Sequence, residues 1–221
     1  MFRESDARAL ILARVAGEKP ERTPARAAME YALLPREYRR AGVLSLEERQ
    51  RLFEDRLRDY DAGVHRATLP SVSATIGQLL AARGARRVAV PGDFPAALLP
   101  PGFDFLPGDG LSAQDLDGLD GAVSGCAAAI AISGSLVLQS AAWQGPRMLS
   151  LVPDYLLCLV RAEQVVETVP EAFGLLAATS TLPTTFISGP SATADIEMTR
   201  IRGVHGPRVL DVVLVSGEDR I

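Results

Sequence analysis

Apolar residues in the second half of the chain fall into two alternating patterns, helical spacing and short β-branched runs. Val72, Ile76 and Leu80 share one face of a helix that Gly84 ends, and the apolar run over residues 87–90 then predicts a parallel strand. Further strands are predicted at residues 122–125, 135–139, 155–160, 184–188 and 209–215, and further helical segments at residues 127–131 and 162–178. This alternation predicts an α/β domain of three layers with a mostly parallel sheet, whose ligand site lies at the carboxyl ends of the strands.

The first 68 residues have a different pattern. Residues 4–16 form an amphipathic helix, and the prolines of residues 19–40 predict an irregular, exposed connection. A second helix is predicted to begin at Ser45, because Ser45 and Glu48 have the spacing of a capping box. We therefore expect a helical extension over residues 1–68 and an α/β domain over residues 69–221. The extension is also where a homo-oligomer contact could form.

Composition limits the class of protein. The 221 residues are 48% hydrophobic and 23% charged, which is enough apolar material for one core. The net charge of −4 argues against a nucleic-acid binder that relies on neutralising phosphates. No apolar segment has membrane length, and charged residues interrupt the N-terminal apolar residues, unlike a signal peptide. We expect a cytoplasmic protein without a membrane segment.

Residues that commonly hold cofactors are scarce. The two cysteines, Cys126 and Cys158, form no CxxC pair, so they cannot hold an iron–sulfur cluster or zinc without outside ligands, and buried thiols are expected. His65 and His205 are too few for a histidine-rich metal centre, and the single lysine, Lys19, makes a Schiff-base mechanism improbable. No GxGxxG follows a strand. We therefore expect neither a metal nor a bound cofactor.

Residues 184–215 are the richest in chemistry. A strand ends at Ser188, Gly189 starts a tight turn, and Ser191 is placed to cap a new helix that Thr193 would share. The first turn of a helix presents unpaired N–H groups and the positive end of its dipole, which suits a phosphate or carboxylate. The Thr193 hydroxyl would be free in that turn.

An acid, an imidazole and a guanidinium follow within the same stretch. Asp195 would share a helix face with Ser191 and serve as general base or orienting acid, with His205 as proton shuttle. Arg208 and the helix end at Ser191 would clamp an anion. Each of these residues also has a structural reading, as a cap, a dipole-favoured acid or a turn residue. The residue types alone leave both readings open.

A second candidate anion site lies upstream. Ser133, Gly134 and Ser135 place two hydroxyls on either side of a glycine, as in an anion-cradling turn, although a helix C-cap with solvated serines has the same pattern. Arg147, in a following loop, would add a cation if its side chain points inward. Trp143, the one tryptophan, is expected to be a packing residue or an interface anchor.

Several sequence segments taken together resemble a known family. The segment GPSATADIE at residues 189–197 and the segment GVHGPR at residues 203–208 are similar to the C-terminal signature of the LUD-domain family, and residues 128–138 and 147–160 extend the match. The resemblance implies the fold shared by CoA transferases and sugar-phosphate isomerases. It also implies a component of a cytoplasmic system that oxidises L-lactate to pyruvate with iron–sulfur partner proteins.

The sequence departs from the family pattern at places that matter for mechanism. Ile132 stands where the family commonly has a glutamate, so a covalent glutamyl mechanism loses its natural candidate. Ala192 and Asp154 stand where relatives often have a basic residue and a histidine. Two other roles therefore stay open. One is an independent enzyme acting on a phosphorylated or carboxylated substrate, and the other is a non-catalytic module that binds such a metabolite and reports it to partners. Whether the chain has turnover of its own is not decided by its sequence.

Overall fold

The chain divides into two units by its internal contacts. The computed structural model describes residues 4–17, 23–194, 200–202 and 206–217. The first unit is Met1–Tyr38 and the second is Arg39–Ile221. The boundary predicted between residues 68 and 69 does not coincide with this division, since residues 39–68 lie in the second unit.

The first unit contains two helices, α1 (Glu4–Gly17) and α2 (Pro24–Ala32). The first of them was predicted and is confirmed. The second lies in the segment predicted to be irregular, so that prediction was wrong. Pro24 starts this helix instead of preventing it, because proline is tolerated in the first turn, and the Thr23 hydroxyl accepts a hydrogen bond from the Arg26 N–H as N-cap.

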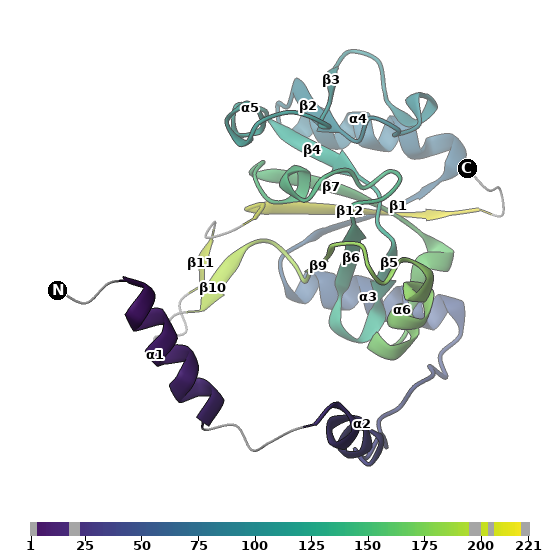
Figure 1. Ribbon diagram of the computed structural model, residues 1–221. Coiled ribbons are helices and arrows are strands. Elements are labelled where there is room, and N and C mark those ends of the chain that lie inside the picture. The colour runs from purple at the N-terminus through teal and green to yellow at the C-terminus, as the bar shows by residue number, and fades with distance from the viewer. Residues whose placement is uncertain (1–3, 18–22, 195–199, 203–205, 218–221) are drawn as a thin grey trace. The chain divides into compact units, whose positions relative to one another are not determined.

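The second unit is built on a parallel sheet of six strands in the order β1-β12-β7-β4-β2-β3 (Figure 1). Every neighbouring pair in it is parallel. Its longest strand, β12, lies between β1 and β7 and carries the apolar run that predicted it. The predicted α/β class with a mostly parallel sheet is therefore confirmed. The strands are β1 (Gly63–Thr68), β2 (Arg87–Val90), β3 (Asp104–Pro107), β4 (Gly121–Ser124), β7 (Tyr155–Arg161) and β12 (Val209–Ser216).

A second sheet of four strands has the order β8-β5-β6-β9 and is mostly antiparallel. Two of its strands fall in segments predicted to be helical, so the helical predictions for residues 127–131 and for residues 165–166 were wrong. Alanine favours helices locally, but Ala128 and Ala129 are fully buried in this sheet, and tertiary packing overrides the local preference. The strands are β5 (Ala128–Ile130), β6 (Ser135–Gln139), β8 (Val165–Val166) and β9 (Thr184–Ile187).

Helices cover both faces of the six-stranded sheet. In Figure 1, α3 (Leu46–Asp59) and α4 (Val72–Ala82) lie on opposite sides of it. The predicted capping box of α3 is present, with the Ser45 hydroxyl accepting from the Glu48 N–H and the Glu48 carboxylate accepting from the Ser45 N–H. The other helical segments are α5 (Ala113–Asp117), α6 (Val169–Leu175), and the 3₁₀ turns η1 (Leu69–Ser71), η2 (Ala96–Leu98), η3 (Ala131–Ser133), η4 (Arg147–Ser150), η5 (Ala162–Gln164) and η6 (Ala177–Thr179).

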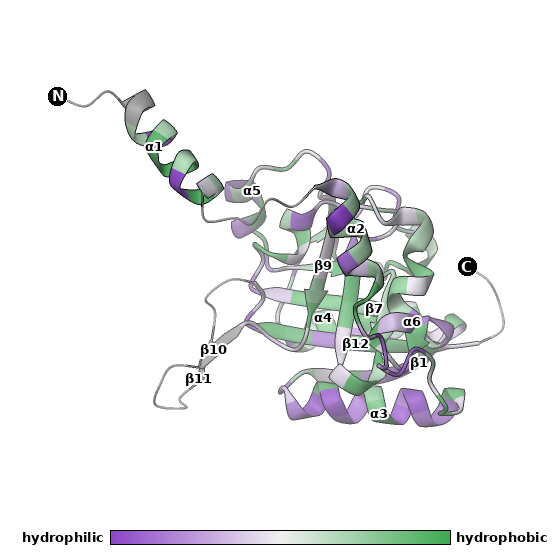
Figure 2. Cartoon of the chain, turned by 60° about the horizontal axis from the view of Figure 1, so that its bottom comes forward, coloured by the Kyte–Doolittle hydropathy of each residue, from purple (hydrophilic) through white to green (hydrophobic). Residues whose placement is uncertain are grey.

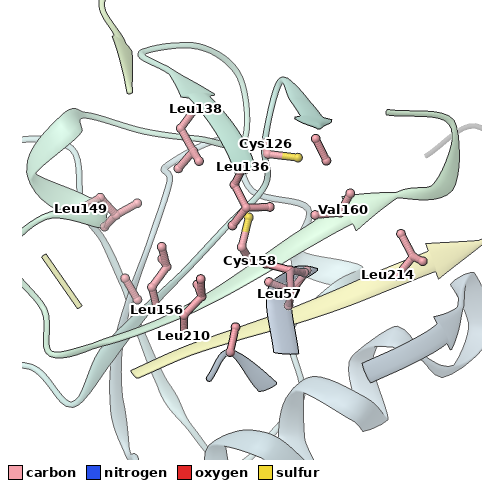
Figure 3. Packing of buried hydrophobic residues seen from close by; sticks show 14 of the residues in the cluster. Leu57, Cys126, Leu136, Leu138, Leu149, Leu156, Cys158, Val160, Leu210 and Leu214 are labelled. Atoms are coloured by element: carbon pink, nitrogen blue, oxygen red, sulfur yellow. The ribbon is translucent and has the colours of Figure 1, made fainter. Parts of the chain in front are cut away.

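The hydrophobic core has a layer on each face of the sheet. Along β7, Leu156 packs on the face toward α3 and Leu157 on the face toward α4, because successive side chains of a strand point to opposite sides. Figure 3 shows the first layer, in which Leu57 of α3 lies among leucines of both sheets. In Figure 2 the strands are coloured mainly as hydrophobic and α3 mainly as hydrophilic, consistent with one apolar stripe on this helix facing inward. Residues 39–68 therefore supply both a core helix and a strand.

Candidate functional site

The glycine turn after β9 is present as predicted. Gly189 has a φ of +83°, in the left-handed region that glycine tolerates. A β-carbon at this position would come within 2.4 Å of the Tyr60 β-carbon, so a side chain would collide with the end of α3. The turn therefore requires glycine for two reasons: its left-handed backbone and its close packing against the end of α3.

The helix predicted after this turn is absent, and that prediction was wrong. Residues Ala192–Ala194 form strand β10, which pairs antiparallel with β11 (Arg200–Arg202). The Ser191 N–H donates to the Pro207 carbonyl at 2.7 Å, so it is not an open helix-end donor. The backbone of this segment finds its hydrogen bonds across a hairpin, in which Thr193 is in register with Ile201, instead of along a helix. No helix dipole is available at Ser191.

Two residues of the predicted site lie outside the residues that the structure describes. Asp195 lies in residues 195–199, and His205 lies in residues 203–205. The roles of Asp195 as a base and of His205 as a proton shuttle stay predictions.

A cleft of about 330 Å³ joins η4 to the turn after β9. Of the predicted residues, Arg147, Gly189 and Ser191 line it, together with Gly206 and Pro207. Within the described part of the chain, the Arg147 guanidinium has no ion pair or hydrogen bond. The cleft, lined at η4 and at Pro207, lies where the chain enters β7 and β12, at the amino ends of these strands. This is not the carboxyl edge where the sequence predicted the ligand site.

The serines of the second candidate site connect to the same cleft. The hydroxyl oxygens of Ser133 and Ser135 lie 2.8 Å apart, and those of Ser135 and Ser188 lie 2.7 Å apart. Ser188 lines the cleft, and Ser135 is buried. Gly134 ends η3 with a φ of +58°, and its α-carbon is packed against α3 so closely that a β-carbon would lie 2.8 Å from the Arg56 β-carbon. The sequence did not single out Ser188, although it directly precedes the predicted glycine turn.

Arg208 has a partner outside the residues that line this cleft. Its Nη1 lies 3.4 Å from Oδ2 of Asp154, and both side chains are well exposed. Pairs of this kind contribute little to stability because water screens them. The residue that replaces a family histidine, Asp154, thus faces the predicted anion clamp.

A buried charge cluster was missed at the sequence level. The Asp211 carboxylate is 3% exposed and accepts hydrogen bonds from the Tyr155 hydroxyl at 2.9 Å and the Arg83 Nε at 3.0 Å, while His65 Nε2 lies 3.3 Å away. Burial and the neighbouring Asp211 carboxylate raise the pKa of Tyr155. A carboxylate that interrupts an otherwise apolar strand is the signal that could have revealed the cluster. We assign it to stability, because it joins β1, β7, β12 and the end of α4.

Both cysteines are buried free thiols, as predicted. The hydrogen bond to the Cys158 thiol and burial raise the pKa of Cys126, so its thiol is held in the neutral form (Figure 3). Among the described residues, no group of three or more His, Cys, Asp or Glu side chains could hold a metal ion. None of the described helices is both long enough and apolar enough to cross a membrane.

Comparison with known proteins agrees with the fold and the C-terminal sequence segments. Residues 113–215 match the family described as LUD domain. Lactate utilization protein C of Deinococcus radiodurans is 40% identical over 205 residues, which cover 91% of this chain and 90% of the relative. The chain belongs to the LUD-domain family.

Two further comparisons cover smaller shares of this chain. Lactate utilization protein C of Shouchella clausii is 39% identical over 83 residues, covering 35% of this chain and 36% of the relative. A crystal structure of a DUF162 family protein from Deinococcus radiodurans superposes with a TM-score of 0.67 at 37% identity, covering 78% of this chain and 99% of the other. Within its family, the chain is thus similar along most of its length to one protein named lactate utilization protein C and over about a third of its length to another.

Proposed function

We propose that the protein is a component of a system that oxidises L-lactate to pyruvate together with iron–sulfur partner proteins, and that its cleft binds a phosphate- or carboxylate-bearing ligand. The observation that carries the role is the 40% identity, over 91% of this chain, to a protein named lactate utilization protein C. The chain has two cysteines, fewer than the four thiolates that usually hold a cluster, which supports placing the electron-carrying clusters on the partners.

The cleft beside the Gly189 turn supports the anion part of the proposal. Arg147 contributes a guanidinium, which binds carboxylates and phosphates through paired N–H donors, and no described residue neutralises it. Ser188 lines the same cleft, and the hydrogen bonds that link its hydroxyl through Ser135 to Ser133 hold it in place as a further polar group for the anion. The anion would therefore be held by one fixed cation and by hydroxyls, not by the helix end that the sequence predicted.

The biological role is tested by deleting the gene in the native host. We expect growth on L-lactate as sole carbon source to be lost and growth on pyruvate to be unchanged, with the wild-type gene restoring growth on lactate. A tagged chain is expected to co-purify with proteins that contain iron and acid-labile sulfide. Normal growth on lactate after deletion would contradict the role.

The anion site is tested by melting temperature in inorganic phosphate and in pyrophosphate. At a ligand concentration about tenfold above Kd, binding stabilises the folded state by about 1.4 kcal/mol, which is roughly 3–6 °C for a chain of this size. The Arg147→Gln variant is expected to lose this shift. The Arg51→Gln variant is the matched control, because Arg51 is an exposed arginine of α3 paired with Glu47 and its loss changes the net charge equally.

Two outcomes would count against the anion site. One is the absence of any shift in the wild type with either anion. The other is an equal shift in wild type and Arg147→Gln. A third variant, Arg208→Gln, decides whether that predicted residue takes part, since its guanidinium already pairs with Asp154.

A further inference from the structure

A second pocket lies at the opposite edge of the sheet, where β4, β7 and β12 end. It has a volume of about 260 Å³ and is separate in its lining from the cleft beside Gly189. Leu159 and Arg161 of β7, Val215 of β12 and Gly125 after β4 form its floor. Ligands of open parallel sheets bind at this carboxyl edge. The location is the one that the strand pattern predicted, although none of the residues predicted for the site is here.

The pocket wall is mostly apolar and contains a single charged side chain. Val72 from the start of α4 and Leu98 from η2 face the floor residues, and Arg161 is the one charged residue that lines the pocket. The Arg161 Nε is buried and lies 2.8 Å from the Glu163 carboxylate without forming a hydrogen bond. Because this Nε is buried and ion-paired, a ligand in the pocket would contact the terminal NH₂ groups of the guanidinium, which form no hydrogen bond with the described residues.

The two glutamines of the pocket are already engaged by the protein. Gln164 accepts from the Arg161 backbone N–H at 2.9 Å and donates to the Cys126 carbonyl at 2.7 Å. Gln144 accepts from the Gln139 backbone N–H at 2.7 Å. These amides shape the wall, which leaves Arg161 as the group that would decide the charge of a ligand.

Trp143 is held in this wall in a strained conformation. Its φ is +64°, a left-handed value that is uncommon for residues other than glycine and is strained for a bulky side chain. The Asp93 carboxylate accepts from its backbone N–H at 3.0 Å, and its ring packs on Phe94 at 6.1 Å between centroids. The Gly125 N–H donates to the Trp143 carbonyl at 2.6 Å, which also holds the tryptophan backbone in place. Strain of this kind concentrates at ligand-binding positions.

We propose that this pocket binds a small monocarboxylate with an apolar body. The carboxylate pairs with the Arg161 guanidinium through parallel N–H donors, and the hydrocarbon part lies against Trp143, Leu98 and Val72. The one guanidinium of the wall already pairs with the exposed Glu163 carboxylate, so it can match at most a single further negative charge, not the several charges of a phosphate ester. The site is independent of the cleft at Arg147 and goes beyond the function proposed above.

Trp143 makes the test direct, because it is the only tryptophan in the chain. The intact protein is titrated with hexanoate and with hexanamide, its uncharged counterpart, while tryptophan emission is followed and calorimetry measures the same binding. We expect saturable binding of hexanoate and binding of hexanamide that is weaker by about tenfold or more. No saturable binding of hexanoate, or equal binding of hexanamide, would overturn the proposal.

Three variants locate the ligand. Arg161→Gln is expected to weaken hexanoate binding by about tenfold or more, and Arg51→Gln, the exposed charge-matched control in α3, is expected to leave it unchanged. Ala142→Leu tests the pocket a second time, in case Arg161→Gln fails to fold. Ala142 is an exposed residue of the pocket rim, so a leucine there should leave the fold intact, fill the space and weaken hexanoate binding. Unaltered binding in both Arg161→Gln and Ala142→Leu, or an equal loss of binding in Arg51→Gln, would place the ligand elsewhere and refute the site.

Discussion

Deleting residues 1–68 is expected to abolish cooperative folding, whereas deleting residues 1–38 is expected to leave a chain that folds. The shorter deletion removes the first unit and keeps every contact within residues 39–221. The longer deletion also removes α3, whose Phe53 and Leu57 are fully buried, and β1, which pairs with β12 along its whole length from Gly63 to Thr68.

The stability lost with residues 39–68 is expected to exceed the total stability of a domain of this kind. Each fully buried Phe or Leu is worth about 1.5–3 kcal/mol, and total stabilities are about 5–15 kcal/mol. Removing α3 also uncovers Leu136, Leu156 and Leu210, which are buried in the core layer on the α3 side of the sheet. Little stability would remain after these losses.

Chemical denaturation followed by circular dichroism measures both truncated chains. Residues 39–221 are expected to unfold in one cooperative transition, and residues 69–221 are expected to show none. A cooperative transition in residues 69–221 would contradict this expectation. It would support instead the boundary between residues 68 and 69 that the sequence pattern predicted.

Replacing Asp211 with asparagine is expected to lower the free energy of unfolding by about 1–3 kcal/mol, because the buried Tyr155 hydroxyl and the half-exposed Arg83 guanidinium lose their charged acceptor. The Asp211 carboxylate receives donors from Tyr155 and Arg83, and the Arg83 guanidinium lies 4.7 Å above the Tyr155 ring. An asparagine keeps the shape but loses the charge, and its NH₂ group would face donors instead of acceptors if it took the place of Oδ2.

A matched control for this variant exists on the surface. Asp154→Asn makes the same chemical change beside an arginine, but Asp154 and Arg208 are exposed and 3.4 Å apart. We expect that variant to cost less than about 0.5 kcal/mol. A double-mutant cycle of Asp211→Asn with Arg83→Gln should show a coupling of about 1–3 kcal/mol. Equal losses in Asp211→Asn and Asp154→Asn would show that the buried cluster does not stabilise the fold as argued.

The predictions that held rest on patterns within about fifteen residues of chain. The capping box at Ser45 and the apolar face of Val72, Ile76 and Leu80 encode their helices locally, and β-branched runs encode β2 and β12. Alternation of these patterns was sufficient to predict the α/β class with its parallel sheet. The finer likeness to CoA transferases and sugar-phosphate isomerases stays a prediction.

The predictions that failed concern segments that favour a helix locally but pair with residues far away in the sequence. The alanines of β5 favour a helix in isolation, yet they are buried between β6 and β8. Ser191 has the chemistry of a helix cap, yet its N–H bonds to the carbonyl of Pro207 and the following residues pair with β11. Such hydrogen bonds join residues that have no fixed spacing in the sequence, so periodicity cannot reveal them.

The sequence by itself determined the fold class, the family and the residues with the chemistry to bind an anion, including Arg147, Gly189 and Ser191. Only the tertiary structure decided which of them share a cleft, that Arg208 faces Asp154 instead, and that Arg161 and Trp143 line a second pocket at the other edge of the sheet. The physical reason is that side-chain type and local spacing are properties of the chain. Proximity depends on the strand order β1-β12-β7-β4-β2-β3, which long-range pairing and core packing select.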